Sequence, residues 1–154
     1  MEHAEHMTEQ ESLIHDRAAE MRNGGSWFYW IAGLSIVNSL IVTFGGNWGF
    51  FLGLGITQLI DSLFAGVAQG TGVGAFQWGA LAINLVISGV FAGFGYFARR
   101  GASWAFILGI FLYILDALLY LTFGGYLAFA FHLFALFFMV KGLIGSRRFY
   151  QGED

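Results

Sequence analysis

The chain contains no cysteine and no proline, and charged residues make up only 11% of its 154 positions. The absence of cysteine excludes disulfides, thiolate nucleophiles and zinc–thiolate or iron–sulfur sites. The absence of proline means that any helix kink must come from glycine or from side chains that bond the backbone. The 23 glycines are the residues available for that role.

The shortage of charge is greatest in the middle of the chain. Between Gly24 and Val140 the charged side chains are Asp61, Arg99, Arg100 and Asp116. Hydrophobic residues make up 57% of the chain, against about 45 to 50% in soluble domains. The uncharged runs reach about 20 residues, the length that crosses the hydrocarbon core of a bilayer. The composition therefore predicts one all-α, polytopic membrane bundle.

These apolar runs predict five membrane spans, with a four-span chain as the alternative. The spans are expected at residues 26–44, 48–68, 77–98, 102–123 and 126–144. At a rise of about 1.5 Å per residue, each span covers roughly 28 to 33 Å, which matches a bilayer. Tryptophans near the starts of the first four spans support these boundaries, because their rings favour the headgroup level. These residues are Trp27, Trp30, Trp48, Trp78 and Trp104.

The polar part of the chain lies at its N-terminus. Residues 1–25 are acidic and have a thin apolar stripe, which predicts a short amphipathic helix on the membrane surface ahead of the first span. The bundle is expected to occupy residues 26–145, and residues 146–154 form a short tail that is basic and then acidic. This charge distribution gives no reason to expect nucleic acid as a partner.

Basic residues indicate the orientation in the membrane. If five spans alternate, the Arg99–Arg100 turn and the basic C-terminal residues lie on one side, which the positive-inside rule places in the cytoplasm. The N-terminal tail would then lie on the opposite side. A four-span chain would instead place both termini in the cytoplasm.

Each predicted span also carries polar side chains on one helix face. They are Asn38 in the first span, Gln58 and Asp61 in the second, Asn84 in the third, Tyr113 and Asp116 in the fourth and His132 in the fifth. Hydroxyl residues on the same faces include Ser35, Ser39 and Tyr120. An ionised acid at a helix centre costs about 2.5 to 3.5 kcal/mol on insertion scales, so the aspartates should be paired, protonated or hydrated. We therefore expect these side chains to meet inside the bundle as a candidate polar or ion site.

Two interpretations of this polar set stay open. Polar side chains join membrane helices through interhelical hydrogen bonds, and we interpret Asn38 and Asn84 in this way. For Asp61 and Asp116, a structural role and an ion- or proton-binding role are equally consistent with the sequence. His132 beside the two acids would be a candidate for a proton relay.

Two further patterns concern packing. Small residues recur four positions apart at Gly49 and Gly53, Gly66 and Gly70, Gly89 and Gly93, and Ala105 and Gly109. This spacing lets helix backbones approach closely, which favours a tight bundle and self-association. The sequence Thr-Phe-Gly-Gly also occurs twice, at residues 43–46 and 122–125. The repeat predicts that the first two spans and the last two form an inverted pair around the third.

A set of residues between Arg99 and about Gly142 forms a recognisable pattern: Arg99-Arg100-Gly101, Trp104-Ala105-Phe106, Gly109, Leu112-Tyr113, Leu115-Asp116-Ala117-Leu118, Phe131-His132 and Phe134-Ala135-Leu136-Phe137. In this stretch, which is under a third of the chain, and more weakly at residues 53–61, the sequence resembles a family of small bacterial polytopic membrane proteins that has no assigned activity. The resemblance implies a location in the bacterial inner membrane. Members of this family are often four-span proteins, so the resemblance also supports the four-span alternative.

Catalytic motifs are absent from the sequence. It has no nucleophile elbow, no HExxH and no phosphate loop, and His132 is the single histidine in the predicted spans, which excludes a bis-histidine haem. We therefore expect a non-enzymatic accessory, structural or assembly subunit without cofactor or metal. Its expected partners are the lipid bilayer and further copies of itself or a larger membrane complex. The alternative is a small proton- or ion-coupled transporter or channel that uses Asp61 and Asp116, with His132 and Tyr113 completing the site.

Overall fold

The computed structural model describes residues 2–46 and 53–151, and this part of the chain forms five α-helices and no strand. The helices are α1 (Glu2–Thr43), α2 (Gly55–Thr71), α3 (Ala75–Arg99), α4 (Ser103–Thr122) and α5 (Tyr126–Gln151). In these described residues α1, α3, α4 and α5 are long and apolar enough to cross a membrane. The prediction of an all-α, polytopic membrane bundle is confirmed.

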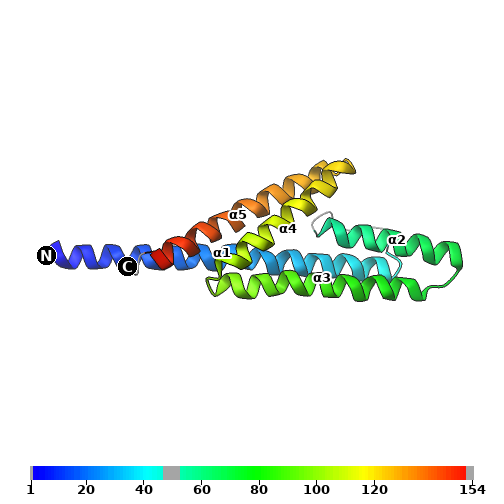
Figure 1. The fold of residues 1–154 in the computed structure, drawn as a ribbon, viewed down its shortest axis with the longest axis horizontal. Coiled ribbons are helices and arrows are strands. Elements are labelled where there is room, and N and C mark those ends of the chain that lie inside the picture. Colours follow the sequence, from blue (N-terminus) through cyan, green and yellow to red (C-terminus); the bar gives the residue numbers. More distant parts are fainter. Residues whose placement is uncertain (1, 47–52, 152–154) are drawn as a thin grey trace.

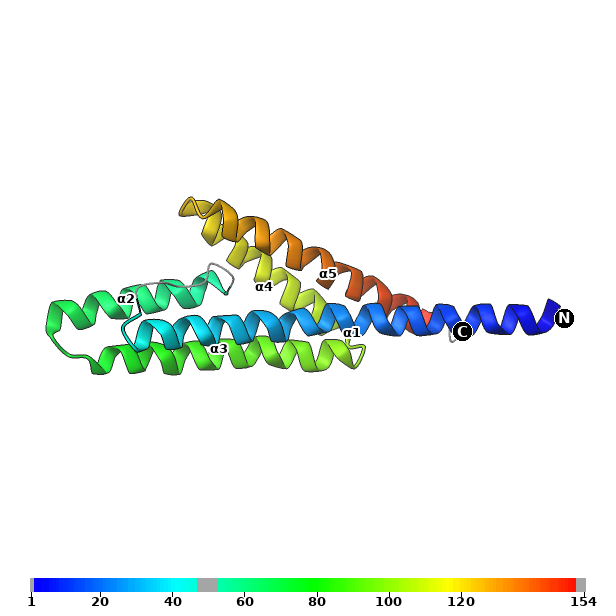
Figure 2. The same ribbon diagram turned by 180° about the vertical axis from the view of Figure 1, so that it is seen from behind.

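The helices are arranged around the antiparallel pair α1 and α3, which lie side by side along most of α3 (Figure 1). The hairpin of α4 and α5 is inclined to this pair, and α5 returns along α1. Gly24 and Gly142 bring α1 and α5 into backbone contact, since a Cβ built on Gly24 would lie 2.5 Å from the Cα of Gly142. Figure 2 shows α2 lying along the α1–α3 pair, at the end far from the chain termini.

The predicted surface helix and the first span are one continuous helix of 42 residues. The pair Gly24-Gly25 does not break this helix, because both glycines are used for packing. Gly24 lies against Gly142, and a Cβ built on Gly25 would be 2.9 Å from the backbone nitrogen of Arg99. The predicted boundary near residue 25 is therefore wrong, and the polar N-terminal residues extend α1 beyond the bundle (Figure 1).

The second predicted span, 48–68, differs most from the structure. Its first residues lie outside the described part of the chain, and α2 starts at Gly55 and has only 17 residues. The Leu54 N–H donates to Ser35 Oγ at 2.8 Å. Because Ser35 lies eight residues before the end of α1 at Thr43, α2 begins about 12 Å inside the bundle.

From this starting point α2 runs outward again. Its length is about 25 Å, and it ends at Thr71, beyond the end of α1 (Figure 1). The helix therefore begins inside the bundle and leaves it on the side where α1 ends, so it does not cross. The structure favours the four-span alternative over five spans, with α2 as a half-spanning helix.

The half-spanning α2 changes the placement of the N-terminus. The N-terminal part of α1 and the last turns of α5 lie at the same end of the molecule (Figure 1), where Arg17 donates to the Arg148 carbonyl at 3.2 Å and Lys141 pairs with Glu20 at 3.3 Å. The prediction that the N-terminal tail lies opposite the C-terminus is wrong, because it assumed that α2 crosses. All seven basic side chains are instead at this end: Arg17, Arg22, Arg99, Arg100, Lys141, Arg147 and Arg148.

Aromatic pairs mark both ends of the apolar zone. Phe44 meets Trp78 at 5.9 Å between ring centroids, and Phe97 meets Trp104 at 5.3 Å at the other end. Trp78 and Phe97 are 19 positions apart on α3, which corresponds to about 29 Å along the helix. This distance matches the hydrocarbon thickness of a bilayer and agrees with aromatic belts at the two interfaces.

The two Thr-Phe-Gly-Gly segments form the same helix cap. Gly46 N–H donates to Ile41 O and Gly125 N–H to Tyr120 O, each at 2.8 Å, after a glycine with positive φ at 45 and 124. These are Schellman caps, in which glycine adopts the left-handed conformation. The repeat does not extend to an inverted fold, since α4 packs closely along α5 whereas α1 contacts α2 much less.

Candidate functional site

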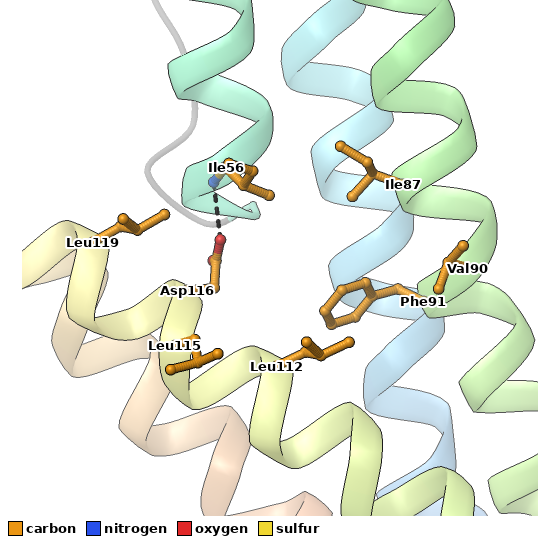
Figure 3. A pocket seen from close by; sticks show the side chains of 8 residues that line it. All are labelled: Ile56, Ile87, Val90, Phe91, Leu112, Leu115, Asp116 and Leu119. Atoms are coloured by element: carbon orange, nitrogen blue, oxygen red, sulfur yellow. Dashed lines mark hydrogen bonds between the residues drawn. The ribbon is translucent and has the colours of Figure 1, made fainter.

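The first turn of α2 is bound by a carboxylate from another helix. Asp116 on α4 accepts the Gly55 N–H at Oδ2, 2.8 Å away, and the Ile56 N–H at Oδ1, 2.9 Å away (Figure 3). A helix start leaves unpaired N–H groups and a partial positive charge, both of which a carboxylate satisfies. Leu54, the residue at the cap position, makes no side-chain capping bond. Asp116 therefore serves as the N-terminal cap of α2.

His132 on α5 binds the other side of the same carboxylate. Its Nε2 lies 3.0 Å from Asp116 Oδ2, and its Nδ1 lies 2.8 Å from the Ala128 carbonyl oxygen. A carbonyl can only accept, so Nδ1 carries a proton. The second ring nitrogen therefore faces the carboxyl group of Asp116 at hydrogen-bond distance. The rings of Tyr113 and Tyr120 fix the imidazole at centroid distances of 4.4 and 4.9 Å.

The non-helical backbone that leads into α2 is satisfied by side chains as well. Tyr120 donates its hydroxyl to the Gly53 carbonyl at 3.2 Å, and Ser35 accepts the Leu54 N–H. Gly53 is closely packed against α1, since a Cβ there would lie 3.1 Å from the Ser35 Cα. Backbone groups at membrane depth need partners inside the protein. Together with Asp116, these side chains provide them.

A second polar group lies further along α2, around Asp61. Ser39 donates to Asp61 Oδ2 at 2.8 Å, and Asn84 Nδ2 donates to Asp61 Oδ1 at 2.7 Å. The same Asn84 nitrogen lies 2.7 Å from Ser39 Oγ and 3.2 Å from the Thr57 carbonyl. Asp61 is 4% exposed and Asn84 is fully buried. This group therefore joins α1, α2 and α3 across the interior.

The predicted polar residues thus form two groups rather than one. Asp116, His132 and Tyr113 belong to the group at the start of α2, and Asp61 and Asn84 belong to the group further along this helix. Asn38 is buried against Gly53, and Gln58 is half-buried beside Asp61. The two carboxylates have different hydrogen-bond partners, because Asp116 binds the first turn of α2 and Asp61 lies further along the same helix.

Nothing in the sequence indicated that Asp116 binds the backbone N–H groups of Gly55 and Ile56. Thr57 was also missed, although its carbonyl binds Asn84 and its hydroxyl donates to the Leu54 carbonyl at 2.7 Å. The sequence feature that marks this site is the pair of glycines that flank Leu54, because glycine allows other groups to approach the backbone closely. Gly55 packs against the ring of Tyr120, where a Cβ would lie 2.9 Å from Cε2.

Each aspartate borders a cavity of its own. Asp116 lies at the edge of a cavity of about 380 Å³ between α2, α3 and α4, whose other lining residues are all apolar (Figure 3). They are Ile56, Ile87, Val90, Phe91, Leu112, Leu115 and Leu119. Asp61 borders a separate cavity of about 220 Å³ together with Asn38 and Gln58. The residues that the structure describes include no group of three or more potential metal ligands.

Comparison with known proteins finds no family model, no curated protein and no solved structure that matches the chain. The candidate site is the buried end of the half-spanning α2 with the residues just before it, which Asp116, Ser35 and Tyr120 bind.

Proposed function

We propose that this chain is a non-enzymatic membrane protein that serves as an accessory or assembly subunit. The observation that supports this role is the bonding of Asp116, whose two oxygens bind two backbone N–H groups and His132. A carboxylate used in this way stabilises the fold and is not free to bind a moving ion. Asp61 is also bonded on both oxygens, by Ser39 and Asn84.

The proposed location is the bacterial inner membrane, with the Arg99–Arg100 turn and both termini in the cytoplasm. The concentration of all seven basic residues at one end of the molecule supports this orientation under the positive-inside rule. The resemblance of residues 99–137 to small bacterial membrane proteins supports the choice of membrane.

A proton- or ion-coupled transporter is the second candidate, and one observation favours it. The N-terminus of α2 lies inside the bundle next to the non-helical residues Gly53 and Leu54. Transporters place the positive ends of discontinuous helices at mid-membrane sites in this manner. In such a mechanism, protonation of the Asp116–His132 pair would weaken the bonds from Asp116 to the first turn of α2. The N–H groups of that turn would then be open to a substrate.

Purified protein in liposomes separates the two functions. We expect wild type to conduct no more protons or monovalent cations than empty liposomes, because both carboxylates are held by internal hydrogen bonds. The measurement is the response of a trapped pH dye and a trapped cation dye to imposed gradients. The variants Asp61→Asn and Asp116→Asn should be equally silent but less stable.

Measured flux across the liposome membrane would contradict the accessory role. Wild-type flux that Asp116→Asn abolishes, in a variant whose helical circular dichroism is unchanged, would replace the accessory role with transport. Flux that both variants retain would place the conducting path elsewhere in the bundle.

We further propose that the accessory role involves self-association through the outer face of α3. Gly89 and Gly93 have open space where a Cβ would lie, so a second helix can approach them closely. Light scattering in detergent should give an oligomer for wild type and a monomer for Gly89→Leu. Gly33→Leu, at an equally open glycine on α1, is the matched control and should stay oligomeric. A monomeric wild type would contradict this contact.

A further inference from the structure

A groove lies on the outside of the α1–α3 pair, at the end that carries the basic residues. It has a volume of about 500 Å³ and is lined by Ser26, Tyr29, Trp30, Gly33 and Arg99. The four α1 residues share one helix face, because they are spaced three, four and seven positions apart. Arg99 reaches this face from the last turn of α3, so the groove has a cationic end and an apolar end.

The cationic end of the groove is held in place by packing. Gly25 allows the closest approach of α1 to α3 here, since a Cβ built on it would lie 2.7 Å from Arg99 Cγ. The Arg99 guanidinium lies 5.9 Å from the centroid of the Tyr29 ring, within the range of a cation–π contact. In the described part of the chain, the ion pairs are His132–Asp116 and Lys141–Glu20, so Arg99 has no carboxylate partner there.

The apolar end runs along α1 toward the middle of the membrane. Trp30 is 66% exposed, and Gly33 beyond it has open space where a side chain would be. Because Gly33 has no side chain, the groove stays open beyond Tyr29 and Trp30, and we call this open stretch the channel. An arginine with aromatic residues at the headgroup level, followed by an open apolar channel, matches an amphiphile with a negative head and a hydrocarbon tail.

We propose that this groove binds an anionic phospholipid, with the phosphate at Arg99 and an acyl chain along Gly33. Arginine binds phosphate oxygens through its planar fork of N–H donors. Arg22 lies one turn before Ser26 on the same face of α1 and adds a second positive charge at this end. The Ser26 hydroxyl donates a hydrogen bond to the Arg22 carbonyl at 2.8 Å. Its oxygen, which lines the groove, is then an acceptor for a glycerol hydroxyl.

The test is binding of short-chain lipids to the full-length protein in detergent micelles, counted by native mass spectrometry. Dioctanoyl phosphatidylglycerol should bind at least about fivefold more tightly than dioctanoyl phosphatidylcholine, the ratio expected from one arginine near the surface. Arg99→Gln should remove this preference, and Gly33→Leu should weaken binding of the anionic lipid by filling the channel.

Two matched controls address charge and bulk separately. Arg147→Gln removes the same charge from the same end of the molecule but on α5, and Gly66→Leu adds the same side chain at an open glycine on α2. Both should bind phosphatidylglycerol as wild type does, and all four variants should keep the wild-type melting temperature.

Three outcomes would overturn the proposal. Equal binding of the two lipids would mean that the headgroup charge is not recognised. An equal loss in Arg147→Gln and Arg99→Gln would show diffuse attraction to the basic end instead of a site. Glycerol 3-phosphate binding as tightly as the lipid would identify a soluble phosphate as the ligand.

Discussion

Replacing Asp116 by leucine is expected to lower the free energy of unfolding by about 3 to 5 kcal/mol, the usual effect of removing one partner from a buried pair. The substitution leaves the N–H groups of Gly55 and Ile56 without an acceptor and His132 without its partner. Thermal and SDS-induced unfolding in detergent, followed by circular dichroism, would measure the loss. Amide hydrogen exchange should rise first in the opening turn of α2, since that turn loses its cap.

Graded variants test whether the cap is the cause. Asp116→Asn keeps one acceptor oxygen but presents an NH₂ group to a donor, so its loss should be smaller, about 1 to 3 kcal/mol. Glu20→Gln removes the exposed ion pair with Lys141, which should change stability by no more than about 1 kcal/mol. If Asp116→Leu unfolds like wild type, Asp116 does not hold α2 in the bundle.

Cysteine labelling is expected to place Glu11 and Arg148 on one side of the membrane and Phe44 and Phe123 on the other. The reason is that α1 and α2 end on the same side of the bundle, and four helices are long and apolar enough to cross. The native chain contains no cysteine, so each single cysteine reports alone and wild type is an unlabelled control. The reagent is a membrane-impermeant maleimide, applied to intact cells and to inverted vesicles.

The expected pattern is all-or-none at each position. Phe44→Cys and Phe123→Cys, at side chains that are 74% and 71% exposed, should react in intact cells. Glu11→Cys and Arg148→Cys should react only in inverted vesicles. Five crossings would instead give Glu11 and Arg148 on opposite sides, with Phe44 beside Arg148. That pattern would show that α2 spans the membrane and would remove the basis for the proposed cap at mid-membrane.

Much of the architecture could be predicted from local sequence features. All four ends of α3 and α4 lie within two residues of their predicted positions, because glycine turns such as Arg99-Arg100-Gly101 act locally. The inward placement of the polar residues also followed from composition, since a lipid environment penalises every exposed acid. Asp61, Asp116, Asn84 and His132 are at most 5% exposed.

Other features could not be predicted because they depend on partners far apart in the chain. Gly24-Gly25 has the composition of a helix break, but its contacts with Gly142 and Arg99 keep α1 continuous. The apolar sequence of α2 has the composition of a span, but contacts with α1 and α4 set where it begins. Composition carries no information on which of two apolar helices stops at mid-membrane.

By itself the sequence determined that this protein is a helical membrane bundle with polar groups turned inward, because the length of an apolar run and the cost of a buried charge are local quantities. Only the tertiary structure decided that α2 stops half-way and that Asp116 caps it. Those facts depend on a bond between groups 61 positions apart. One partner in that bond is a backbone N–H, a donor that every residue except proline possesses and that no sequence pattern marks.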